Sequence, residues 1–132
     1  MNHADIEILD DKNVFGPGET VKGKAVWQVE KSPETAFLRL FWYTKGKGTE
    51  DVEVVSEISF DFPRLKESRP FDMTLPESPY SFSGKLVSLI WAFELVVDGA
   101  EAVRKAIILS PYGLEIDLLQ TTGDALDNEI PA

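Results

Sequence analysis

Residues 87–97, Val-Ser-Leu-Ile-Trp-Ala-Phe-Glu-Leu-Val-Val, decide the fold class of this chain. Every second residue from Val87 to Val97 is apolar, which is the pattern of a β-strand with one buried face. Several apolar residues of the same segment also recur at the spacing of one face of a helix. We reject the helix because the segment ends in Asp98-Gly99, a turn signal, and a second apolar run follows at 102–110. Its Val, Ile, Trp and Phe residues also favour a pleated surface.

Outward from this segment, glycine and proline interrupt the chain so often that helices of ordinary length have little room. We predict an all-β protein, an antiparallel two-sheet β-sandwich of immunoglobulin-like topology with about eight strands. Lys45-Gly46-Lys47-Gly48 is expected to form one hairpin tip, and Asp98-Gly99 a two-residue type I′ turn. The predicted strands are 5–9, 20–29, 35–45, 50–61, 69–75, 84–97, 102–110 and 113–119.

Composition excludes several classes of function. The 132 residues contain no cysteine and one histidine, His3, so a disulfide scaffold, a thiolate nucleophile and multi-histidine metal chemistry are ruled out. A net charge of −10 repels nucleic acid and anionic lipid. Because the longest apolar stretch is too short to span a bilayer and no secretory signal is visible, we expect a cytoplasmic protein that does not insert into membranes.

The C-terminal segment differs in charge from the rest of the chain. Residues 111–132 carry five acidic residues and no Lys or Arg. Alternation continues through Leu114, Ile116 and Leu118, so we predict a domain over 1–119 and an acidic, flexible tail over 120–132.

Residues that suggest catalysis are few. Asp10-Asp11 lacks the ligand spacing of a calcium loop, and no nucleophile motif is present. We expect no enzyme activity, no cofactor and no metal, although a hydrolase with two facing carboxylates remains an alternative.

Candidate binding residues are aromatic or lie at a predicted tip. Tyr80 and Phe82 occupy a turn-rich connection, where each is either an anchor onto the sheet edge or an exposed contact. Lys45 and Lys47 belong to the predicted hairpin tip. The alternative function is a small-ligand or carbohydrate-binding sandwich, which needs an exposed coplanar pair of aromatic rings. Its candidates are Trp27, Tyr43, Tyr80, Phe82 and Tyr112.

Two motifs resemble the arrestin-like β-sandwich superfamily. Residues 15–23, Phe-Gly-Pro-Gly-Glu-Thr-Val-Lys-Gly, are similar to the pattern F-x-P-G-E-x-V-x-G of its first long hairpin. Residues 71–76, Phe-Asp-Met-Thr-Leu-Pro, with Pro79, Ser81, Phe82 and Gly84 and the strand beginning near 89, resemble a second run of the same domains. Together the matches cover about residues 5–110.

The resemblance implies a protein-interaction scaffold without catalysis, like arrestins, the arrestin-like subunit of retromer and bacterial sporulation-control relatives. Members of the arrestin type pair two sandwiches, whereas this chain has the length of one. The phosphate-sensing residues of receptor arrestins have no counterpart here, so no functional residue is carried over. We therefore expect an adaptor domain that binds a protein partner, or a second copy of itself, through a sheet edge or the loops near 44–49 and 76–83.

Overall fold

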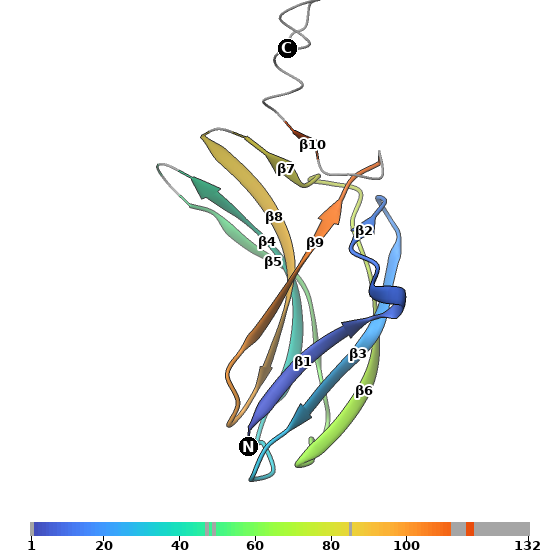
Figure 1. Ribbon diagram of the computed structural model, residues 1–132, viewed down its shortest axis with the longest axis vertical. Helices are drawn as coiled ribbons and strands as arrows, with labels where there is room; N and C mark the ends of the chain where they lie inside the picture. Colours follow the sequence, from blue (N-terminus) through green and yellow to red (C-terminus); the bar gives the residue numbers. More distant parts are fainter. Residues whose placement is uncertain (1, 47, 49, 85, 112–115, 118–132) are drawn as a thin grey trace, which may run out of the picture.

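The computed structural model describes residues 2–46, 48, 50–84, 86–111, 116 and 117 (Figure 1). These residues contain ten strands and one short 3-10 helix, and the all-β sandwich is confirmed. The elements are β1 (His3–Ile8), η1 (Leu9–Asp11), β2 (Val14–Phe15), β3 (Thr20–Gln28), β4 (Ala36–Gly46), β5 (Val52–Ser59), β6 (Lys66–Thr74), β7 (Phe82–Ser83), β8 (Val87–Val97), β9 (Val103–Leu109) and β10 (Ile116–Asp117).

The strands form two layers. The smaller sheet has the order β1-β3-β6, and the larger sheet has the order β10-β7-β8-β4-β5, with β9 paired to β8 and β2 paired to β9. Figure 1 shows the smaller sheet packed across the larger one, with both sheets strongly twisted. The long strands pair antiparallel, as predicted, but the two-residue pairs β2–β9 and β7–β10 are parallel.

The core lies between the layers and uses the predicted alternation. Trp91, Phe93, Leu95 and Val97 of β8 are buried in it, which confirms the strand at 87–97 and excludes the helix. The remaining core side chains come from both sheets and include Ile6, Val21, Trp27, Leu38, Leu40, Phe71, Met73 and Leu109. Each fully buried indole finds a carbonyl acceptor, because Trp27 Nε1 donates to Arg64 O and Trp91 Nε1 to Pro79 O, both at 2.8 Å.

Strand boundaries differ from prediction in two places. The predicted strand 84–97 begins only at Val87, as β8, and the two short strands β2 and β7 were not predicted. Of the predicted strand 113–119, only Ile116 and Asp117 are described, and the predicted tail 120–132 lies outside the described residues.

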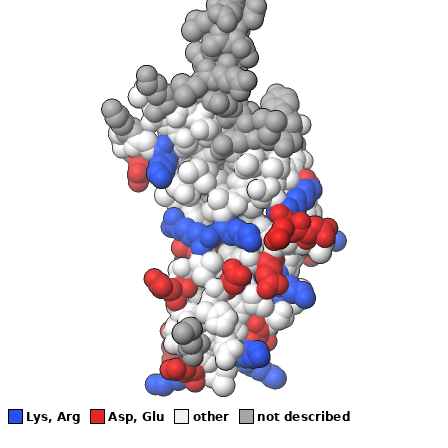
Figure 2. Space-filling view, in the orientation of Figure 1, with Lys and Arg blue, Asp and Glu red and all other residues white. Residues whose placement is uncertain are grey.

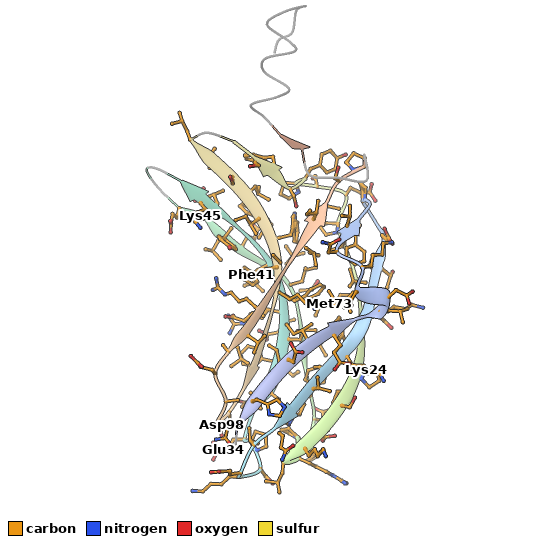
Figure 3. The ribbon with its side chains drawn as sticks, viewed as in Figure 1. Lys24, Glu34, Phe41, Lys45, Met73 and Asp98 are labelled. Carbon is orange, nitrogen blue, oxygen red and sulfur yellow. The ribbon has the colours of Figure 1, made fainter. Side chains whose placement is uncertain are left out.

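The turn after β8 also differs from prediction. Gly99 has a φ of 90°, but Asp98 is not in the positive-φ region, so the turn is not type I′. Asp98 instead bonds the neighbouring loop: its N–H donates to Thr35 O at 3.0 Å, and its Oδ2 accepts from Glu34 N at 3.1 Å. Figure 3 shows Glu34 and Asp98 together at this end of the sandwich and Lys45 toward the opposite end.

Candidate protein-interaction site

Strand β5 is an edge of the larger sheet, since it pairs with β4 and with no other strand in the described part of the chain. The backbone bonds fix which of its groups face outward. Phe60 N donates to Ala36 O and Thr44 N donates to Asp51 O, so hydrogen-bonded pairs alternate with non-bonded pairs from each end of the β4–β5 ladder. This alternation places Val52 and Val54 in non-bonded pairs, with their N–H and C=O groups directed to the free side.

The other long edges are partly blocked. In β6, Pro70 has no N–H to offer to an added strand. On β1, the carbonyl of Ile6 already accepts from Lys105 Nζ at 3.2 Å, and β1 lies against β9. Figure 2 shows the face that carries β1 and β9, with basic and acidic side chains interspersed over its lower part. Strand β5 contains no proline, so each of its outward backbone groups is complete, and we take it as the candidate edge.

An ion-paired row crosses the outer face of the larger sheet beside this edge. Glu57 of β5 pairs with Arg39 of β4 at 3.3 Å, Arg39 with Glu94 of β8 at 3.8 Å, and Glu94 with Arg104 of β9 at 3.3 Å. The four side chains are partly or largely exposed, so each pair contributes little to stability by itself. Glu57 lies at the end of this row, and Arg39 pairs with its carboxylate from the β4 side.

Aromatic rings lie next to this row. Phe41 and Tyr43 stack with ring centroids 5.8 Å apart, and the Arg104 guanidinium lies 5.0 Å from the Phe41 ring centroid. Phe41 is only 3% exposed although it belongs to the outer face, because Tyr43 and Arg104 cover it. The neighbouring depression of about 370 Å³ is lined by Phe41, Tyr43, Thr44, Lys45, Glu50, Val52 and Arg104. Figure 3 labels Phe41 near the middle of the sandwich.

The predicted candidate residues take different roles. Lys45 is exposed at the end of β4, opposite Ser88, and Lys47 lies outside the described residues. Phe82 pairs with Leu89 in β8 and packs partly buried against the core, so it is an anchor. Tyr80 is 36% exposed and is the surface contact of the two. Lys45 and Phe82 therefore share one end of the sandwich, since their partners Ser88 and Leu89 are adjacent.

Ser81 explains why Phe82 and Tyr80 separate in this way. Its N–H donates to Leu109 O at 2.8 Å, and its Oγ accepts from Leu109 N at 2.9 Å. These two hydrogen bonds hold the connection between β6 and β7 against the end of β9. Ser81 itself is buried, Phe82 after it packs against the core, and Tyr80 before it is exposed.

The aromatic alternative lacks an exposed pair of coplanar rings in the described part of the chain. Trp27 and Trp91 are buried in the core, and Trp42 is half-buried against it. The one pair of described rings that is close to coplanar, Phe41 and Tyr43, includes a buried ring. Tyr112 lies outside the described residues.

Acidic residues do not assemble into a metal site within the described ranges. Asp10 and Asp11 are exposed, with φ angles of 60° and 52°, in the short turn after β1. Within the same ranges, no helix has the length and apolar character needed to cross a bilayer.

Phe62 is a surface residue that the sequence analysis missed. It is 91% exposed and has a φ of 50°, and it lies directly after the predicted end of a strand at 61. Arg69 holds the loop, because its Nη2 donates to Asp61 O at 2.8 Å and to Glu67 Oε2 at 2.8 Å. The Arg69 hydrogen bond lowers the pKa of Glu67. Pro63 was the available signal for a loop here, since it cannot donate within a sheet.

Comparison with known proteins supports the fold. The chain is similar in structure to Spo0M, a sporulation control protein from Bacillus subtilis, with a TM-score of 0.59 and 19% sequence identity. The match covers 96% of this chain and 55% of that one, so the chain spans about half the length of this neighbour. At this identity the likeness shows the fold alone, an all-β sandwich like the one described above.

A second solved structure is the alkylpurine DNA glycosylase AlkC from Pseudomonas fluorescens, bound to DNA containing an abasic site analog. It has a TM-score of 0.43 and 11% identity, and it covers 82% of this chain and 30% of that one, so it carries no argument about function. No protein-family model matches the chain, and no curated protein matches it.

Proposed function

We propose that this domain is a non-catalytic protein-interaction or adaptor domain of the arrestin N-terminal type, and that it binds a protein partner by strand addition to the edge of β5. The observation that carries the proposal is the unpaired side of β5, where the N–H and C=O groups of Val52 and Val54 point away from β4. An extended segment gains main-chain hydrogen bonds at such an edge, and alternate side chains supply specificity.

Exposure of the valines supports the same edge. Val52 is 67% exposed and Val54 is 48% exposed on the outer face of the sheet. A strand added beside them would cover these apolar side chains on the side away from Tyr43, which lies opposite Val52 on β4. The likeness in fold to a sporulation control protein is consistent with a regulatory or adaptor role.

Proline substitution at the edge tests the proposal. Val52→Pro or Val54→Pro removes one outward N–H and leaves the hydrogen bonds to β4 intact, because neither residue lies in a bonded pair. The full chain is used as bait in extracts of its source cells, and each proline variant is compared with Val52→Thr or Val54→Thr. We expect the captured partner to be lost with proline and retained with threonine, while circular dichroism shows every variant to be folded.

Retention of the partner by the folded proline variants would contradict strand addition at β5. A wild-type chain that captures no protein and is strictly monomeric by light scattering would contradict an interaction role altogether. Hydrogen exchange gives the direct readout, since the amides of Val52 and Val54 should gain protection when the partner is bound.

A further inference from the structure

The charges along the β5 edge are all of one sign. Residues 50–61 contain Glu50, Asp51, Glu53, Glu57 and Asp61 and no Lys or Arg. Glu57 is paired with Arg39 on the sheet side, at 3.3 Å. Glu50, Asp51 and Glu53 are exposed and have no ion-pair partner among the described residues. An added strand would therefore meet carboxylates that are still available for pairing.

Charge and apolar side chains alternate at this end of β5. Val52 and Val54 lie on the outer face, opposite Tyr43 and Phe41, and Glu53 lies between them and points to the other side of the strand. In a strand added to the free edge, side chains opposite Val52 and Val54 would share the outer face with them. The residue opposite Glu53 would share its side, where an opposite charge is favourable and a like charge is unfavourable.

Self-pairing of this edge is disfavoured by the same charges. Two β5 strands placed side by side would bring Glu53 and its acidic neighbours near acidic residues of the second copy, and the whole chain carries a net charge of −10. Cross-strand repulsion of this kind is a common protection against edge-to-edge association.

We infer that the partner segment of β5 is an extended strand in which Lys or Arg alternates with apolar residues, and that it is not a second copy of this chain. This inference rests on the proposed strand addition. The apolar residues would cover Val52 and Val54, and the basic residue between them would pair with Glu53. A flanking basic residue would reach Glu50 or Asp51, beyond the start of β5.

Three synthetic peptides test this chemistry by amide NMR titration of the full chain. Their repeats are Val-Lys, Val-Glu and Gly-Lys, so the third keeps the charge of the first without its apolar side chains. We expect the Val-Lys peptide to bind most tightly, to shift the amide resonances of Val52 and Val54, and to weaken as salt is raised. Equal binding of the Val-Glu peptide, or shifts confined to residues away from β5, would overturn the inference.

Charge reversal separates local pairing from the overall charge. Glu53→Lys should weaken binding of the Val-Lys peptide by about two- to fivefold and strengthen binding of the Val-Glu peptide. Glu101→Lys makes the same change in net charge at an exposed position in the β8–β9 connection and should leave the preference unchanged. The inference fails if both reversals act equally, or if Glu53→Lys has no effect.

The proline variants keep the two claims distinguishable. If Val54→Pro abolishes partner capture but Glu53→Lys does not change the peptide preference, strand addition stands and the basic partner is wrong. If the proline variants retain the partner, strand addition itself is wrong. Concentration-dependent dimers that disappear in Val54→Pro would show that a second copy occupies the edge, against the inference.

Discussion

The backbone N–H of Leu75 donates a hydrogen bond of 2.9 Å to the carbonyl oxygen of Glu19. The N–H of Gly18 likewise lies 3.4 Å from Pro76 O, and Thr20 pairs with Thr74 in the adjoining ladder of β3 and β6. The two motifs that resemble the arrestin-like superfamily are therefore in direct contact. Each turn provides a backbone acceptor for the other, so the two motifs hold each other in place.

Gly23, the last residue of the first motif, is predicted to be intolerant of any side chain. A Cβ at this position would lie 2.2 Å from the backbone oxygen of Glu7 and 3.0 Å from the Phe71 ring. We expect Gly23→Ala to lower the free energy of unfolding by about 1–3 kcal/mol, as overpacking does elsewhere. Urea denaturation measures the change.

Gly16→Ala is the matched control for Gly23→Ala, since its Cβ would meet only Glu19 Oε1, at 3.9 Å. We expect a change within about 0.5 kcal/mol. Equal losses at the two positions would show that the close approach of Gly23 to β1 does not limit stability.

Glu19 makes stability depend on pH in the acid range. The Lys12 ammonium, followed by the backbone N–H of Gly16, lowers the pKa of Glu19 below its ordinary value of 4.5. The ionised carboxylate therefore stabilises the fold above pH 4.5, and this contribution is lost as the pH falls through the folded-state pKa. We expect Glu19→Gln to be less stable than the wild type at pH 7, with a difference that shrinks below pH 4.5.

Denaturation curves of wild type and Glu19→Gln between pH 7 and acid pH measure this difference. Lys12→Met is the second arm, because it removes the main cause of the shift and should raise the pKa of Glu19 toward its ordinary value in an NMR titration. A wild-type advantage that stays constant with pH would contradict the assignment.

Ser81 is predicted to be a buried polar link whose loss is costly. Ser81→Ala removes the acceptor of the Leu109 N–H and leaves that buried donor unpaired. We expect a loss of about 1–3 kcal/mol in the free energy of unfolding. Ser68→Ala, at an exposed position of β6, is the control and should change stability little. A negligible effect at Ser81 would mean that another group satisfies Leu109 N–H.

Removal of the aromatic ring is predicted to lower stability strongly at Phe60 and to change it little at Phe62. Phe60 is buried and packs against Trp27 with ring centroids 5.7 Å apart, so Phe60→Ala should cost about 3–5 kcal/mol. The exposed ring of Phe62 gains little from folding, and its positive φ suits glycine. We expect Phe62→Gly to unfold within about 0.5 kcal/mol of the wild type, or above it, in the same denaturation assay. A large loss would show that the ring makes a stabilising contact.

Much of the strand pattern could be predicted from local sequence. Alternation identified β4 and β8 because a half-buried strand must place apolar residues at every second position. The short strands β2 and β7 were missed, since two residues are too few for any periodicity. The turn at Asp98 was assigned the wrong geometry because its side chain bonds Glu34 across the end of the sandwich, which local sequence does not reveal.

The candidate site was less predictable. Lys45, Tyr80 and Phe82 were chosen by their loop context, and the structure showed that Phe82 is an anchor and Tyr80 a surface residue. Val52 and Val54 were not predicted as surface contacts, because valine in a strand is usually buried. Their exposure follows from the position of β5 at the end of a sheet.

The sequence by itself determined the class of fold, because side-chain periodicity and the placement of glycine and proline act on neighbouring residues. The tertiary structure alone decided which strand has no neighbour on one side, which indoles are enclosed, and which carboxylates already have a cation beside them. These properties depend on the order in which strands pair, and pairing joins residues that are distant in the chain.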